Sequence, residues 1–177
     1  MKNRAAVLLA ITVSFALAQA PDPFATPAKA VVLLFTRSDC PVSNRYAPEV
    51  RRIYARFKDR DVRFFLVYPD RDETPQTIAQ HRADFSYPFD SIRDPKHVLV
   101  AKAHAQVTPE AAVFVPNGKS WQLVYHGRID DRNSDFGKSR PEPNVRDLDD
   151  TLTAVLAGKP APRTETKAVG CYISDLR

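Results

Sequence analysis

Two cysteines are the residues of this chain best suited to chemistry, and one of them stands in an activating position. Cys40 comes five residues after the apolar run Ala30–Phe35 and directly before Pro41, which suits the first position of a helix because its missing N–H costs nothing there. A thiol at that place faces unpaired backbone N–H groups and the positive end of the helix dipole, and both favour the thiolate. Arg37 and Arg45 add positive charge nearby in the sequence. We therefore predict that Cys40 is a nucleophile, with an inert buried cysteine as the alternative.

The second cysteine lies near the end of the chain. Cys171 stands thirteen residues after Gly158, in a tail without periodic apolar residues. An extended segment of that length spans ~40 Å, which is enough to return to Cys40 if the tail folds back. A thiol catalyst with a single attacking cysteine leaves a mixed disulfide or a sulfenate that another thiol must resolve. Cys171 is the candidate for that second thiol.

Composition excludes several other kinds of site. The first 117 residues contain no glycine, so they cannot form the glycine-rich phosphate loop that dinucleotide-binding and P-loop folds need near the N-terminus. Two cysteines cannot build a four-cysteine zinc site. The four histidines are scattered without a nearby third ligand, and we expect them to face solvent: His81, His97, His104 and His126. The sequence predicts neither a metal nor a cofactor.

The N-terminus has the pattern of a secretory signal. Lys2 and Arg4 precede an apolar run that ends in Ala16-Leu17-Ala18, which fits a cleavage site before Gln19. A secure membrane span needs about 20 residues, so an uncleaved anchor is the less favoured alternative. Loss of residues 1–18 lowers the formal net charge from +5 to +3, which argues against a nucleic-acid partner. We predict a signal peptide at 1–18, a linker at 19–29, export to the periplasm or beyond, and no stable membrane insertion after cleavage.

Alternating strand and helix patterns fill the rest of the chain. Continuous apolar runs at 30–35 and 62–68 indicate strands buried on both faces. Apolar residues at helical spacing predict a helix over 41–58, kinked at Pro48. Shorter helices are expected after Thr74-Pro75 and Asp94-Pro95, followed by a hairpin of strands at 111–115 and 121–129 and a last helix capped by Asn144. This order predicts one α/β domain over 30–158 and a tail over 159–177, with ligands expected at the carboxyl ends of the parallel strands.

These residues resemble a known fold. A strand, a loop, Cys-Pro-Val-Ser and a kinked helix are similar to the active-site turn of thioredoxin-fold proteins, in which a proline follows the nucleophilic cysteine by eight residues, as Pro48 follows Cys40. That fold also places a cis-proline before its penultimate strand, and Val107-Thr108-Pro109 stands at the corresponding place. The chain resembles the redoxin branch, the alkyl hydroperoxide reductase/thiol-specific antioxidant group, and an exported subgroup of it. The resemblance implies a thioredoxin-like fold: a central mixed sheet flanked by helices, with a C-terminal hairpin and helix.

Two departures bear on the activity that the resemblance implies. Ser43 stands where thioredoxin has its second cysteine, so no local disulfide forms within a Cys-x-x-Cys motif. Peroxiredoxins have a threonine three residues before the peroxidatic cysteine, whereas Arg37 stands there in this chain and Thr36 is one residue too early. Neither catalytic pattern is intact, and the fold alone does not decide the activity.

Three functions remain open at this point. In the first, an exported thiol-disulfide oxidoreductase with a redox-active disulfide, Cys40 attacks, Ser43 and Asn44 stabilise its thiolate, the Thr108-Pro109 backbone presents an edge to the substrate, and Cys171 resolves the intermediate. Its partners would be protein thiols or disulfides and an external thiol reductant. In the second, a peroxiredoxin-type antioxidant, the substrate is a hydroperoxide. In the third, Cys40 and Cys171 form a permanent disulfide in a non-catalytic binding or scaffold module, where chain entropy gives ~5 kcal/mol of stabilisation.

Overall fold

The structure is a computed structural model, and it describes residues 21–135, 137–174 and 176. The signal peptide expected at residues 1–18 lies outside the described residues. Among the described residues, no helix is long and apolar enough to cross a membrane.

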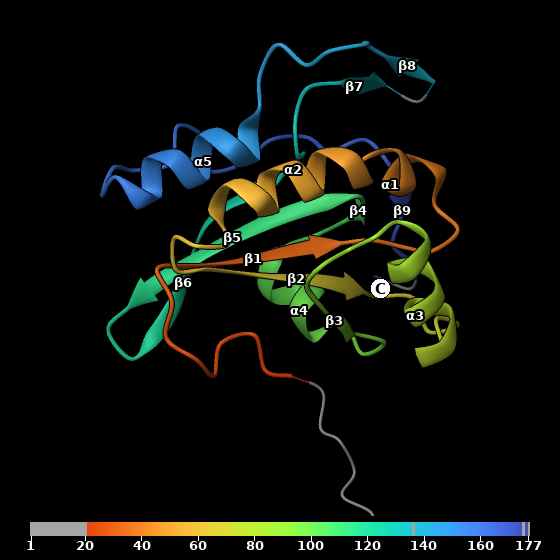
Figure 1. Ribbon diagram of the computed structural model, residues 1–177, viewed down its shortest axis with the longest axis horizontal. Helices are drawn as coiled ribbons and strands as arrows, with labels where there is room; N and C mark the ends of the chain where they lie inside the picture. Colours follow the sequence, from red (N-terminus) through yellow and green to blue (C-terminus); the bar gives the residue numbers. More distant parts are fainter. Residues whose placement is uncertain (1–20, 136, 175, 177) are drawn as a thin grey trace, which may run out of the picture.

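A five-stranded mixed sheet forms the centre of the molecule (Figure 1). The strand order is β3-β2-β1-β5-β6, with β1 parallel to β2, β2 parallel to β3, and both β1–β5 and β5–β6 antiparallel. The bounds of these strands are β1 Ala30–Phe35, β2 Val62–Tyr68, β3 Asp90–Arg93, β5 Glu110–Asn117 and β6 Ser120–Gly127. The thioredoxin-like mixed sheet expected from the sequence, with its terminal hairpin, is confirmed.

Helices cover both faces of this sheet. Their bounds are α1 Pro41–Arg45, α2 Ala47–Phe57, α3 Pro75–Asp84, α4 Val98–Ala103 and α5 Asp147–Leu156. Successive strand residues point to opposite faces. Accordingly, Val32 and Leu34 of β1 belong to the core that also contains residues of α2 and α5, whereas Val31 and Leu33 belong to the core that contains residues of α4. The fully apolar run of β1 is therefore explained by burial on both faces.

Two helix boundaries differ from the predictions. The helix expected over 41–58 is two helices, α1 and α2, separated at Tyr46. Pro48 lies in the first turn of α2, where its missing N–H needs no carbonyl partner, so the chain starts a new helix instead of kinking one. Asn144 does not cap the last helix. That helix begins after Arg146, and the Asn144 N–H instead donates to the Asp131 carboxylate.

The C-terminal tail folds back across the sheet. The N–H of its residue Thr166 donates to the carbonyl of His126 in β6, and the His126 N–H donates to the carbonyl of Thr164. Farther along, β9 (Cys171–Tyr172) pairs antiparallel with β4 (Val107–Thr108). Figure 1 shows β9 beside β4 and next to the start of α1. The tail is thus an integral part of the fold.

A third, small sheet joins β7 (Asn133–Asp135) to β8 (Lys138–Ser139).

One glycine allows this close approach of the tail, and it supports a prediction. Gly127 has φ +139°, and a Cβ built on it would lie 2.2 Å from the carbonyl oxygen of Thr166. Gly127→Ala should therefore lower the free energy of unfolding by on the order of 3 kcal/mol, measured by urea denaturation. Gly118→Ala is the matched control, because its Cβ would meet open space at φ +61° and should cost about 1 kcal/mol. Equal losses of unfolding free energy in the two variants would contradict the close contact between Gly127 and Thr166.

Candidate active site

Cys40 lies where the sequence predicts it, between the end of β1 and the start of α1. It is the N-cap residue of α1, and Pro41 is the first residue of that helix. The thiol is buried, with 1% of the residue exposed. The backbone N–H of Ser43 donates to Cys40 Sγ at 3.5 Å, so the sulfur occupies the place of an ordinary capping oxygen. The Ser43 hydroxyl itself, also buried, makes no hydrogen bond with any described residue.

The fold brings Cys171 to Cys40. The two Sγ atoms lie 2.6 Å apart, which is longer than a disulfide bond of about 2.05 Å, and both residues are free cysteines in the structure. The β4–β9 pairing sets this position, because Cys171 lies opposite Thr108. Thr108 precedes Pro109 through a cis peptide bond, and its carbonyl oxygen accepts a hydrogen bond from the Cys40 thiol at 3.2 Å. Cys40, Ser43, Thr108 and Cys171 therefore form one site.

The two thiols differ in acidity. Burial opposes ionisation of Cys40, but hydrogen bonds from Cys171 and Ser43 outweigh it and lower the pKa of Cys40 below its ordinary value. Burial, together with the hydrogen bond and the negative charge of Cys40, raises the pKa of Cys171 to about 12. Arg37 acts in the opposite direction on Cys171. Cys40 is therefore the first of the two thiols to ionise, and Cys171 stays protonated and can donate to the Cys40 thiolate once it forms.

This difference predicts a two-step titration of the reduced protein. One thiolate should form below pH 9, the ordinary thiol value, and the second only near pH 12. Because the thiolate is the attacking species, the rate of disulfide exchange should rise with pH up to the first step and then level off. Ultraviolet thiolate absorbance measures both steps, and Cys40→Ser should remove the first. Two thiols that titrate together near pH 9 would contradict the assignment.

The charged residues expected around Cys40 contribute unequally. Arg37 forms ion pairs with Asp39 at 2.9 Å and with Asp70 at 3.4 Å, so its positive charge is shared. Arg45 is exposed at the C-terminal end of α1, and none of the residues described by the structure forms an ion pair with it. The position of Cys40 at the helix N-terminus and its hydrogen bonds, more than these two arginines, therefore determine how readily its thiol ionises.

Asn44 has a different role from the one expected. Its side chain does not reach the thiolate, because the amide Nδ2 donates to the Ser38 carbonyl at 2.9 Å and Oδ1 contacts His81 Nε2 at 2.8 Å. Since Oδ1 can only accept, His81 Nε2 is the donor, and Nδ1 accepts from the Tyr68 hydroxyl at 2.7 Å. Asn44 thus holds the loop that leads into Cys40.

His81 belongs to the site, and the predicted solvent-facing position of this histidine is wrong. It is buried with 3% exposed, and burial lowers its pKa, which favours the neutral ring that this hydrogen-bond chain requires. The spacing of His81 indicates that it is buried, because it follows the apolar Ile78 by three residues and therefore lies on the same inner face of α3.

Two buried glutamates were also missed. Glu73 accepts the N–H of Ser38 at 2.7 Å, and Glu110 accepts the N–H groups of Gln106 at 2.9 Å and Val107 at 3.3 Å. Each carboxylate therefore fixes the backbone of one loop that borders the cysteine pair. In the described part of the chain, no group of three or more His, Cys, Asp or Glu residues is arranged to hold a metal ion.

Comparison with known proteins agrees with this geometry. The AhpC/TSA family model matches residues 21–120, more than half of the chain, and the match includes both Cys40 and Pro109. The chain belongs to the AhpC/TSA family. Membership in the AhpC/TSA family supports a thiol-based redox function. No curated protein matches the chain.

Solved structures share the fold of this AhpC/TSA protein. An uncharacterized conserved protein of Geobacillus kaustophilus is 22% identical with a TM-score of 0.68, over 82% of this chain and 77% of that one. A hypothetical protein of Sinorhizobium meliloti 1021 is 20% identical with a TM-score of 0.70, over 82% of this chain and 79% of that one. At these identities the likeness shows the fold alone.

Proposed function

We propose that this AhpC/TSA protein is an exported thiol-disulfide oxidoreductase in which Cys40 attacks and Cys171 resolves. The observation that carries the proposal is the 2.6 Å approach of the two sulfurs, one a buried helix N-cap with a lowered pKa and the other delivered by a tail strand. Export rests on the basic start, apolar run and small residues of positions 1–18. The Cys40 thiol alone would suffice to attack a substrate disulfide, but a second thiol is needed to release the substrate from the mixed disulfide.

The exchange proceeds in two steps. First, the Cys40 thiolate attacks one sulfur of a substrate disulfide. A Cys40–substrate S–S bond forms, the substrate S–S bond breaks, and the departing thiolate takes a proton from solvent. Second, Cys171 loses its proton and attacks the Cys40 sulfur, which forms the Cys40–Cys171 disulfide and releases the second substrate sulfur as a thiol. The substrate gains two electrons and two protons, and an external thiol reductant returns them to the cysteine pair.

The electrostatics of the site suit the order of these steps. While Cys40 is a thiolate, its negative charge helps to raise the pKa of Cys171, so the resolving thiol stays protonated. In the mixed disulfide Cys40 carries no charge, and that contribution disappears. Arg37, which lowers the pKa of Cys171, remains. Cys171 therefore becomes a better nucleophile only after Cys40 has reacted.

A permanent disulfide is the second candidate function, and the firm attachment of the tail favours it. Ile173 is 4% exposed and its N–H donates to the Gln106 carbonyl at 3.0 Å, which is the behaviour of a structural segment. The reduction potential separates the two functions. A value below about −300 mV would indicate a structural disulfide, and a higher value a redox-active one. Peroxide reduction has less support, since Arg37 stands in place of the peroxidatic threonine.

Non-reducing peptide mapping across a series of redox buffers tests the proposal. We expect a Cys40–Cys171 disulfide that opens at potentials above about −300 mV, and a Cys171→Ser variant that accumulates a mixed disulfide on Cys40 with a protein disulfide substrate. A disulfide that stays closed throughout, or a variant that traps nothing, would overturn the redox role. Rapid and selective sulfenate formation on Cys40 with peroxide would favour the peroxidase instead.

A further inference from the structure

The substrate edge beside the cis-proline is filled by the protein's own tail. The resemblance to thioredoxin-fold proteins predicts that the Thr108-Pro109 backbone presents an edge to the substrate. In the structure β9 pairs with β4 there, with Cys171 opposite Thr108 and Tyr172 opposite Val107. The tail therefore places a cysteine sulfur against Cys40 on an antiparallel strand, which is the arrangement that the proposed function requires of an attacked substrate sulfur.

The side chains of this tail strand alternate between the protein and solvent. Cys171 points to Cys40, Tyr172 is 78% exposed, and Ile173 is buried in the core that contains residues of α4. This alternation follows from the period of two in an extended strand. Just before the cysteine, Gly170 leaves no room for a side chain, because a Cβ there would lie 2.0 Å from the Thr108 carbonyl oxygen. A segment that lies along β4 in this way therefore needs four residues in order: a glycine, a cysteine, any residue, and an aliphatic residue.

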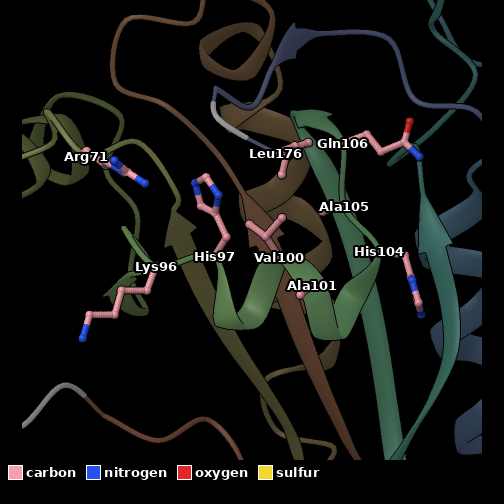
Figure 2. Close-up of a pocket in the computed structure, with 9 residues that line it drawn as sticks. All are labelled: Arg71, Lys96, His97, Val100, Ala101, His104, Ala105, Gln106 and Leu176. Atoms are coloured by element: carbon pink, nitrogen blue, oxygen red, sulfur yellow. The ribbon is translucent and has the colours of Figure 1, made fainter.

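Beyond Ile173 the tail reaches the cavity drawn in Figure 2, of about 690 Å³. Leu176 of the tail lies at its upper edge in that view, over Val100 of α4. Arg71 and Lys96 present their nitrogens on one side of the cavity, and His97 lies between Lys96 and Val100. Two permanent cations and no carboxylate are found among the described residues that line it, so a segment that continues into this cavity meets positive charge.

We infer that residues 170–173 are an internal copy of the substrate. The partner that fits is a protein segment in extended form with the pattern Gly-Cys-Xaa-aliphatic, followed by acidic residues, whose cysteine is part of a disulfide. This inference rests on the proposed function and names the substrate class of the same site. The segment displaces β9, pairs with β4, buries its aliphatic side chain in the place of Ile173 and extends its acidic residues toward Arg71 and Lys96. Cys171 then returns to resolve the mixed disulfide as the reduced segment leaves.

Synthetic peptides test this inference with the full-length reduced protein. The probe is Gly-Cys-Tyr-Ile-Ser-Glu with its cysteine joined to glutathione, and the readout is the rate at which peptide and glutathione thiols are released. Cys40 takes either the peptide or the glutathione into the mixed disulfide, and Cys171 releases it, so that each turnover oxidises one cysteine pair and yields both thiols. Peptides with Ile→Asn, Gly→Val or Glu→Lys change one position each.

We expect each of the first two changes to slow the reaction by about tenfold, since the subsite buries an aliphatic side chain and excludes a Cβ before the cysteine. Glu→Lys should slow the reaction by about threefold, and Lys96→Gln in the protein should weaken this charge preference, since Arg71 remains. Lys119→Gln, on the β5–β6 turn, is the matched control and should keep it. A protein that reduces all four peptides equally would overturn the inference and leave the proposed function standing, whereas one that reduces none of them would overturn both.

Discussion

Cys40→Ser is expected to lower the rate of thiol-disulfide exchange by at least about a thousandfold. A serine hydroxyl has no thiolate equivalent at neutral pH and cannot form a mixed disulfide. The fold should survive the change, because serine is a favoured helix N-cap and its oxygen can accept the Ser43 N–H that Cys40 Sγ now accepts. The loss of activity should therefore come without a loss of stability, which steady-state rates and urea denaturation measure separately.

Cys171→Ser is the matched control for this prediction. It keeps the attacking thiolate, so the first step should still occur, but the mixed disulfide should persist and turnover should stop after one event per molecule. Mass spectrometry of the intact protein distinguishes a trapped adduct from an unreacted thiol. If Cys40→Ser kept a tenth or more of the activity, or if the adduct formed on Cys171, the assignment of the nucleophile would be wrong.

Gly170→Ala should have the second largest effect. The new Cβ would lie 2.0 Å from the Thr108 carbonyl oxygen and 3.0 Å from the Pro109 nitrogen, and these are backbone atoms that cannot move aside cheaply. We expect β9 to detach from β4 and the equilibrium constant for forming the Cys40–Cys171 disulfide, obtained from its yield in redox buffers, to fall by at least about tenfold, equivalent to about 1.4 kcal/mol. Non-reducing peptide mapping gives the yield directly.

Gly158→Ala separates the clash from the general cost of replacing a glycine. Gly158 has φ +70° and a Cβ there would meet nothing within 4 Å, so its variant should lose about 1 kcal/mol of stability and none of the disulfide. A Gly170→Ala protein with an unchanged disulfide yield would show that the tail reaches Cys40 by another path, and it would remove the basis for the substrate pattern inferred above.

Local patterns were sufficient for the fold and for the position of the thiol that we propose as the nucleophile. The apolar run of β1 indicates a strand buried on both faces, Pro41 begins a helix at Cys40, and Thr108-Pro109 precedes β5. Each of these signals acts over a few residues, through backbone dihedral limits, missing N–H groups or alternation of side chains. For the same reason the split at Tyr46 follows from Pro48, although the helical pattern over 41–58 predicts only a kink at this proline.

The surroundings of Cys40 depend on contacts between distant parts of the chain. His81 is buried because α3 packs its inner face toward Tyr68, and it reaches Asn44 only in the folded protein. The amino-acid sequence by itself determined a helix N-cap cysteine in a thioredoxin-like sheet and a second cysteine within reach. Only the tertiary structure decided that the tail pairs with β4 and places Cys171 against Cys40, because that path depends on two glycine contacts, at Gly127 and Gly170, whose partners are known only once the chain is folded.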